Sequence, residues 1–323
     1  GLAIVMEIQN GQILSSVSLP DYNPQKYSSF NHNNLINRVF QSNYEMGSTF
    51  KPITATMGFD FGIINSETKF DVTRKFLNIG DYHKFKGDGV YDVEKIIVES
   101  SNIGTAQMAT LIGKKNQKEF FSKIGFNDRI ILENKESAIP LGNKNNWGKV
   151  ETATIGYGHG FSITPLHLVK AYATLSNKGI EVFPTLQLNK KNAKKIVLKN
   201  EKSSDFFLSL LKSVVLKTEY TGPRVRIEGY EVGGKTGTSD LVNPMGGYYK
   251  KRNLTSFIGV FPIDNPKYVI YTALEYPKKE EGTNQKMTGG RVNAPLVKKI
   301  IISMINLLNI PKKNKNELLK VDI

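Results

Sequence analysis

The order of strand-like and helix-like patterns constrains the fold of this chain more than any other feature of its sequence. Residues 2–8 and 12–19 are rich in β-branched and apolar side chains, and Asn10-Gly11 between them is typical of a tight hairpin turn. Similar strand patterns return only near the other end of the chain, at residues 230–234, 255–261 and 268–275. Both ends of the sequence therefore predict strands.

The long middle of the chain has the apolar spacing of helices instead. We expect helices at about residues 49–59, 93–98, 105–112, 117–124, 165–175, 206–216 and, after the last strand, 294–308. This order predicts an α/β fold of the α+β kind. One central antiparallel sheet is built from both ends of the chain, is flanked by helices and carries an inserted helical lobe.

The expected domain covers residues 1–310. Its sheet lobe comprises about residues 1–65 and 217–310, and its helical lobe about residues 66–216. Residues 311–323 are rich in Lys and Asn and are expected to form a basic flexible tail.

Composition excludes several classes of protein. The 323 residues include no Cys, which removes disulfide frameworks, thiol nucleophiles and cysteine-bound metals. The four His residues are scattered and form no His-Glu-x-x-His pattern, so we expect no metal site. The net charge is +15, but only seven of the 44 basic residues are Arg, the residue that reads phosphates and guanine edges best. We therefore expect no nucleic-acid partner.

A Ser and a Lys three residues apart form the first candidate catalytic motif. Ser48 and Lys51 lie at the start of the helix expected over residues 49–59, so their side chains share one face. A Lys amine can take the proton of a Ser hydroxyl if the amine is neutral when the reaction begins. The same spacing occurs at Ser66 and Ser209, but only Ser48 follows a Gly and opens a helix.

Two further motifs follow along the chain. Ser100 and Asn102 are two residues apart, so that the Ser could relay a proton and the Asn could donate from its amide. The third motif, Lys235-Thr236-Gly237-Thr238, lies on an expected strand. Its Lys and two Thr hydroxyls form an edge that can bind a carboxylate, and Gly237 would let a substrate backbone lie close to the strand.

The order of these motifs resembles that of the penicillin-recognising serine enzymes, in which Ser-x-x-Lys, Ser-x-Asn and Lys-Thr-Gly follow one another. The 52 residues from Ser48 to Ser100 and the 133 from Asn102 to Lys235 look like the spacing of class B penicillin-binding proteins. Longer segments resemble the septal, cell-division type, namely residues 47–52, 100–105, 158–160 with 164–166, and 233–238.

The resemblance implies a peptidoglycan D,D-transpeptidase that needs no cofactor and is acylated by β-lactams. By motif match, Ser48 is the acylated nucleophile and Lys51 is its general base. Ser100 and Asn102 assist proton transfer and hold the donor peptide.

The resemblance also implies how the substrate is bound. Lys235, Thr236, Gly237 and Thr238 would bind the carboxylate of a stem peptide that ends in D-Ala-D-Ala. The backbone N–H groups of Ser48 and Thr238 would form the oxyanion hole.

The location and partners follow from the same resemblance. The domain is expected on the periplasmic side of a bacterial inner membrane, with a membrane anchor outside this chain. Expected partners are division-complex membrane proteins, including a lipid-II glycosyltransferase. We also expect an open groove for the acceptor and no residue placed to activate water.

Several alternatives remain open. A serine β-lactamase or D,D-carboxypeptidase would share the three motifs, as would a non-catalytic β-lactam sensor. Residues 229–236 match the P-loop pattern, but turn residues follow them where a P-loop needs a helix. A Ser-His-Asp hydrolase lacks its Gly-x-Ser-x-Gly elbow here. Residues 239–253 and 278–289 are expected to be loops that are either simply exposed or border the active-site groove.

Overall fold

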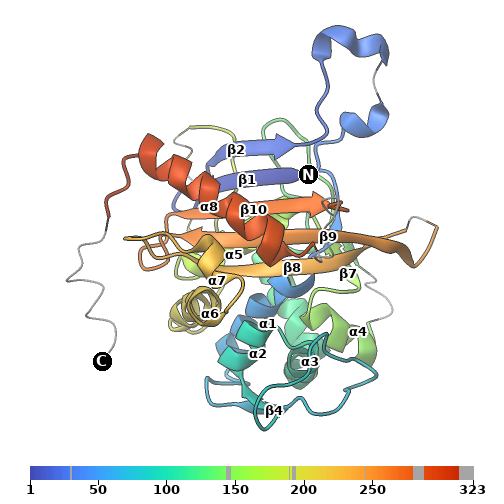
Figure 1. Ribbon diagram of the computed structural model, residues 1–323, viewed down its shortest axis with the longest axis vertical. Coiled ribbons are helices and arrows are strands. Elements are labelled where there is room, and N and C mark those ends of the chain that lie inside the picture. Colours follow the sequence, from blue (N-terminus) through green and yellow to red (C-terminus); the bar gives the residue numbers. More distant parts are fainter. Residues whose placement is uncertain are drawn as a thin grey trace.

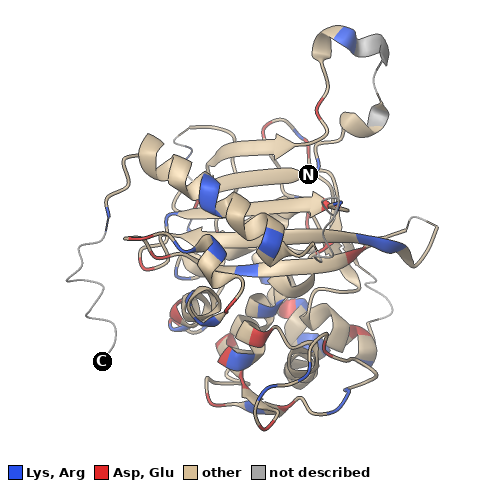
Figure 2. Ribbon diagram, viewed as in Figure 1, with Lys and Arg blue, Asp and Glu red and all other residues tan. Residues whose placement is uncertain are grey.

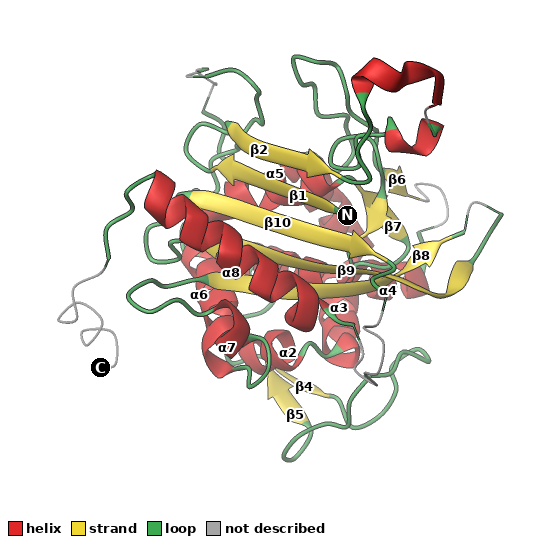
Figure 3. Ribbon diagram, turned by 45° about the horizontal axis from the view of Figure 1, so that its top comes forward, coloured by secondary structure: helices red, strands yellow, loops and turns green. Residues whose placement is uncertain are grey.

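A five-stranded antiparallel sheet forms the centre of the molecule in the computed structural model (Figures 1 and 3). The structure describes residues 1–29, 31–142, 147–188, 190, 194–243, 245–278 and 287–312. The strand order is β2-β1-β10-β9-β8, so β8 and β2 are the edges. These strands are β1 (Leu2–Glu7), β2 (Ile13–Ser18), β8 (Gly233–Val242), β9 (Tyr248–Phe261) and β10 (Tyr268–Glu275).

The pairing of β1 with β10 joins the two ends of the sequence. Leu2 lies opposite Ala273 and Glu7 opposite Tyr268. The expected hairpin of β1 and β2, and the sheet built from both ends of the chain, are therefore confirmed.

Helices cover both faces of this sheet. Side chains alternate along each strand, so neighbouring apolar residues of one strand pack against helices on opposite faces. Ile4 of β1 belongs to the core cluster that contains residues of α5 (Pro165–Ser176) and α6 (Ser203–Lys217). The next residue, Val5, faces a second cluster with α8 (Gly289–Leu307).

Most of the remaining helices gather below the sheet in the view of Figure 1. They are α1 (Lys51–Asp60), α2 (Val93–Glu99), α3 (Asn102–Ile124) and α4 (Lys149–Gly156). The short α7 (Gly222–Val225) lies at the level of the sheet instead and packs on α8. The shorter elements are η1 (Pro24–Ser29), η2 (His32–Asn34), η3 (Gly47–Phe50), β3 (Tyr44–Glu45), β4 (Lys69–Asp71), β5 (Val90–Asp92), β6 (Leu141–Gly142) and β7 (Phe161–Ile163).

The structure corrects three sequence expectations. The strand expected at 230–234 begins at Gly233 and runs to Val242, and most of 239–253 is a hairpin of β8 and β9 rather than a loop. The helices expected at 105–112 and 117–124 are one element, α3, interrupted at Gly113 by a φ of 80°. Helix α4 was not expected, because its eight residues are too few to show a clear period.

The division into two lobes remains a proposal. Within the proposed helical lobe, α5 packs on β1, β9 and β10, and α6 packs on β8, so both touch the sheet directly. These contacts indicate that the helical lobe ends before residue 165 rather than at residue 216.

Most of the expected basic tail, residues 313–323, and the middle of the expected loop at 278–289 lie outside the described residues. Lys and Arg are spread over helices and strands, with acidic residues between them (Figure 2). Among the described residues, no helix has both the length and the apolar character that a membrane crossing requires.

Candidate active site

Ser48 lies in the 3-10 turn η3, directly before α1. The backbone N–H of Lys51 donates to the carbonyl of Ser48, so the turn that carries Ser48 continues directly into the helix that carries Lys51. The expected helix start is confirmed, although its first turn is 3-10 rather than α. Pro52 in the first turn of α1 has no N–H to leave unpaired.

Two glycines bring this turn close to its neighbours. Gly47 has a φ of +54°, and a Cβ on it would lie 2.6 Å from the carbonyl oxygen of Thr238. Gly158 has a φ of +85°, and a Cβ there would lie 2.3 Å from the carbonyl oxygen of Gly47. The N–H of Gly47 also donates to the carbonyl of Gly158, at 3.1 Å. These close approaches hold Ser48 beside strand β8.

Gly237 is also required by the packing of the protein itself. A Cβ on it would lie 2.3 Å from Ser256 Oγ and 2.9 Å from Thr49 Cγ2. The missing side chain therefore leaves room for the protein's own atoms, and β8 packs on η3 through this gap. The expectation that a substrate backbone lies close to the strand at Gly237 stays a prediction.

Lys51 is completely buried, and its ammonium points at the second motif. Its Nζ donates to the carbonyl of Ser100 at 2.5 Å, to Ser100 Oγ at 3.2 Å and to Asn102 Oδ1 at 2.7 Å. The amide nitrogen of Asn102 donates to the carbonyl of Gly80 at 3.5 Å. In this structure Asn102 therefore offers its oxygen to Lys51.

Lys235 approaches the same hydroxyl from the sheet. It is 1% exposed, and its Nζ donates to Ser100 Oγ at 3.1 Å. Ser100 thus accepts from two lysines, which its two lone pairs allow. Its backbone is left-handed, with φ 58° and ψ 40°, because it ends α2 just before Ser101 caps α3.

The surroundings of both buried amines disfavour their charged forms. Burial lowers the pKa of Lys51 well below its usual 10.5, and the nearby Lys235 lowers it further, while Asp81 opposes both effects. Burial also lowers the pKa of Lys235, to about 7. A neutral Lys51 next to a protonated Lys235 is therefore accessible near neutral pH.

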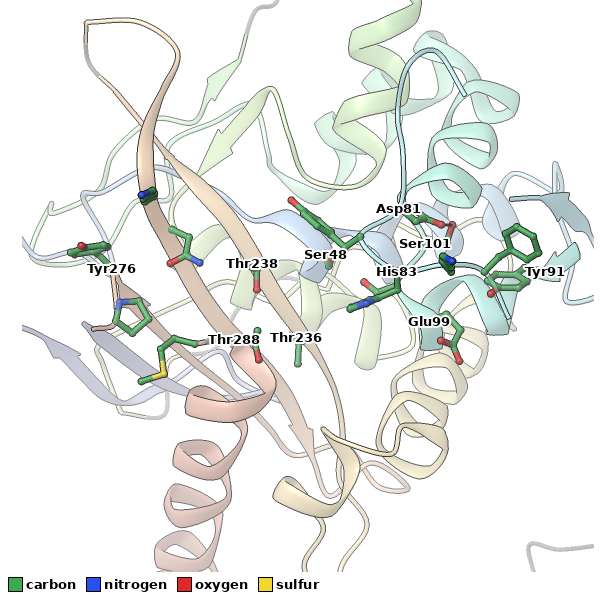
Figure 4. Close-up of a pocket in the computed structure, with 18 of the residues that line it drawn as sticks. Ser48, Asp81, His83, Tyr91, Glu99, Ser101, Thr236, Thr238, Tyr276 and Thr288 are labelled. Atoms are coloured by element: carbon green, nitrogen blue, oxygen red, sulfur yellow. Dashed lines mark hydrogen bonds between the residues drawn. The ribbon is translucent and has the colours of Figure 1, made fainter. Parts of the chain in front are cut away.

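A cavity of about 790 Å³ opens above these lysines (Figure 4). All three motifs contribute to its wall through Ser48, Ser100, Thr236 and Thr238. Ser48 lies between the side chains of the helical part, such as His83 and Glu99, and those of the strands (Figure 4). A ligand bound in this cavity would therefore lie against Ser48, which lines the cavity wall.

Both expected loops contribute to the cavity. Lys251 and Asn253 of the first, and Lys278, Met287 and Thr288 of the second, line the wall. These residues therefore border the groove rather than lie on an unrelated surface.

The competing motifs do not form sites. After Lys235-Thr236 the chain continues as strand β8 and not as a helix, which removes the P-loop. Ser209 lies on α6 and donates to the carbonyl of Phe206 at 2.8 Å. Among the described residues, no group of three or more His, Asp or Glu side chains could hold a metal ion.

The family model of the penicillin-binding protein transpeptidase domain matches residues 1–302. This chain belongs to that family. The family expected from the three motifs is therefore confirmed.

Named relatives of this transpeptidase domain support the same family assignment. The chain is 31% identical to the probable peptidoglycan D,D-transpeptidase FtsI of Caulobacter vibrioides over 97% of its own length and 55% of the relative. It is 32% identical to stage V sporulation protein D of Bacillus subtilis, over 98% of its length and 51% of the relative. The chain thus spans about half the length of these relatives.

A solved structure confirms the fold of the transpeptidase domain. The apo transpeptidase domain of Burkholderia pseudomallei penicillin-binding protein 3 superposes with a TM-score of 0.80 at 26% identity, over 97% of this chain and 89% of that one. The relatives named FtsI fit the class B, septal type that the sequence indicated.

Sequence reasoning missed Asp81, which organises the second motif of the transpeptidase domain. Its carboxylate accepts from Ser101 Oγ at 2.6 Å, from the N–H of Asn102 at 2.5 Å and from the N–H of Ile103 at 3.0 Å. It thereby holds the first turn of α3, from which Asn102 reaches Lys51. No motif signals this residue, because it precedes the first residue of α3 by 21 positions and contacts the helix only in the folded protein.

Replacing Asp81 with Ala is expected to lower the free energy of unfolding by about 1–3 kcal/mol, because three donors at the start of α3 lose their acceptor. Asp81→Asn keeps one oxygen acceptor and should cost less. Urea unfolding at one pH measures the free energy of unfolding of both variants. The control is Asp71→Ala, which removes an exposed carboxylate that accepts from the N–H and the hydroxyl of Thr73. Equal losses for the Asp81 and Asp71 variants would contradict this role.

Proposed function

We propose that this chain is the catalytic domain of a serine-type peptidoglycan D,D-transpeptidase that cross-links stem peptides at the division septum. The observation that carries the proposal is the convergence of Lys51, Ser100, Asn102 and Lys235 in one hydrogen-bonded group below a cavity that Ser48 lines. Ser48, Lys51, Ser100 and Asn102 act in catalysis. Lys235, Thr236, Gly237 and Thr238 form the strand that binds the substrate.

The first step forms an acyl-enzyme. Ser48 Oγ attacks the carbonyl carbon of the penultimate D-Ala, and its proton passes to the neutral amine of Lys51. The backbone N–H groups of Ser48 and Thr238 stabilise the oxyanion, a contribution of about 3–4 kcal/mol for each such donor. The C–N bond then breaks, and the proton reaches the departing D-Ala amine through Ser100.

The second step transfers the acyl group to another stem peptide. The acceptor amine attacks the ester of Ser48, its proton returns through Lys51 and Ser100, and the Ser48 hydroxyl is regenerated. Lys235 holds the carboxylate of the leaving D-Ala during the first step, with the Thr236 and Thr238 hydroxyls beside it.

The geometry favours transpeptidation over hydrolysis. Two carboxylates line the described part of the cavity, and both already have protein partners. Asp81 accepts from the start of α3, and Glu99 pairs with Lys86 at 3.0 Å. Neither is free to activate a water molecule as a β-lactamase would require.

We place the domain on the periplasmic side of a bacterial inner membrane, with an anchor outside this chain. Its partners would be division-complex membrane proteins, including a lipid-II glycosyltransferase. The relatives named FtsI support this placement.

The test uses a fluorescent penicillin and a thioester donor with an amine acceptor. We expect one long-lived adduct, located on Ser48 by mass spectrometry, and transfer of the donor acyl group to the amine. Rapid loss of the adduct would indicate a β-lactamase. A stable adduct without donor turnover would indicate a sensor, and no adduct would refute the proposal.

The acylation rate is expected to follow a bell-shaped pH profile. It rises with pH while Lys51 loses its proton, at a pH far below the usual 10.5. It falls again above pH 7, because Lys235, with a pKa of about 7, loses the charge that binds the carboxylate. Stopped-flow acylation by benzylpenicillin from pH 5 to 10 measures both limbs. Lys235→Arg stays charged and should lose the alkaline limb, and an unchanged profile would contradict the assignment.

A further inference from the structure

We propose that the end of the cavity beside β9 and β10 is a subsite for a carboxylate in the acyl chain of the donor peptide, bound by Lys251 and Lys278. This carboxylate is additional to the C-terminal one that Lys235 is proposed to bind. The inference rests on the proposed function, and it adds a charge preference to the same site.

The subsite is a defined end of the cavity. Lys251 and Asn253 come from β9, and Tyr276 and Lys278 come from the segment after β10. The N–H of Tyr276 donates to the carbonyl of Asn253 at 2.7 Å, which fixes the two segments to each other. Figure 4 shows Tyr276 on the opposite side of Thr238 from Ser48.

The cavity is larger than the reaction itself requires. Its volume of about 790 Å³ lies in the range that encloses drug-sized ligands. A donor whose terminal dipeptide occupies the part beside Ser48 and Thr238 therefore has room for further acyl residues toward Tyr276.

The positive charge at this end of the cavity has no ion-pair partner in the part of the chain that the structure describes. Among the described residues, neither Lys251 nor Lys278 forms an ion pair. Arg252 follows Lys251 in β9, and its guanidinium lies 5.0 Å from the ring of Tyr249 and 5.8 Å from that of Tyr276, which lines the same end of the cavity. Like charges held together in this way favour an anionic ligand.

The nearby acids do not cancel this charge. Glu275 is already paired with Arg38 at 3.4 Å and accepts from the hydroxyl of Tyr44. Asp240 lies opposite Asn253 in the strand register, but it forms no ion pair with a described lysine. Among the residues that the structure describes, this end of the cavity therefore carries more cationic than free carboxylate groups.

A carboxylate fits this end better than a neutral group of the same shape. Each partly exposed ion pair contributes a modest amount, so two lysines predict a preference of about 3- to 10-fold rather than an absolute requirement. Because the pairs are exposed to solvent, the preference should shrink as salt is added.

The experiment compares two thioester donors that differ only in one acyl-chain group, a free carboxylate or its carboxamide. For the unmodified protein at low salt, we expect kcat/KM to be about 3- to 10-fold higher for the carboxylate donor. In the Lys251→Gln/Lys278→Gln double variant this ratio should approach one. A ratio measured on one enzyme sample cancels any loss of folded protein.

The matched control is Lys267→Gln/Lys299→Gln, which removes the same charge from exposed positions away from the cavity. Its ratio should equal that of the unmodified protein. Equal rates for the two donors, or a preference that survives in the Lys251/Lys278 variant, would overturn the subsite while penicillin labelling of Ser48 and donor turnover left the proposed function intact. An absence of labelling or of turnover would overturn the function and the subsite together.

Discussion

Acylation by a penicillin is expected to slow by about two to four orders of magnitude when Lys51 is replaced with Met, because a positioned general base contributes about that much. Met keeps the length and burial of the side chain but has no amine to take the proton of Ser48. The second-order rate constant with benzylpenicillin measures the effect.

Two comparisons make this result specific. Ser48→Ala removes the nucleophile and should give no adduct at any time, so it sets the baseline. The Lys51 variant should stay folded, because Met fills the same buried space and removes the cost of burying an amine, which offsets the lost donor to Ser100 and Asn102. A Lys51→Met protein that is folded and acylated at the normal rate would exclude Lys51 as the base.

Gly158→Ala is expected to lower the free energy of unfolding by about 2–5 kcal/mol and to reduce acylation in the protein that remains folded. The left-handed backbone costs an Ala about 1–2 kcal/mol, and the overlap with its neighbours adds about 1–3 kcal/mol. The new methyl would lie 2.3 Å from the carbonyl oxygen of Gly47, next to the nucleophile.

Gly160→Ala separates these two effects. Gly160 has nearly the same φ, +78°, but a Cβ there would lie 3.5 Å from its nearest neighbour, Thr154 Oγ1. It should show only the backbone cost, about 1–2 kcal/mol, and a normal acylation rate. If both Ala variants lose the same stability and the same rate, the contact between Gly158 and Gly47 does not position Ser48. Chemical denaturation and penicillin labelling of each variant give both quantities.

The fold was largely predictable because its signals are local. The Asn10-Gly11 turn and the β-branched run of β10 each identify their own element. The sequence predicts a loop over residues 239–253 because they are rich in Gly, Lys and polar residues, yet the strands of this hairpin pair from Gly233 opposite Val260 to Val242 opposite Tyr248. Pairing between strands is a tertiary property that composition does not record.

The site was predictable only as far as its motifs are contiguous in sequence. The convergence of Lys51, Ser100 and Lys235 confirms that the three motifs meet, while the catalytic role of each residue stays a prediction. The approach of the Lys51 amine to the Ser48 hydroxyl also stays a prediction, since Lys51 donates to Ser100 and Asn102 here.

Two features of the site could not be read from the sequence. Asp81 reaches α3 across twenty intervening residues through its carboxylate. Gly237 is required by contacts with Ser256 and Thr49, which lie elsewhere in the chain. Both depend on distances between segments, and no spacing rule supplies those.

The pairing of β1 with β10 has a consequence for the synthesis of the protein. While the polypeptide emerges in order, β1 can pair at once with β2, but its other edge has to wait until Tyr268–Glu275 has been made. During that interval the apolar strand exposes unpaired backbone groups, which invite association with other chains. The free edge of β1 is therefore open to association with other chains until β10 has been synthesised.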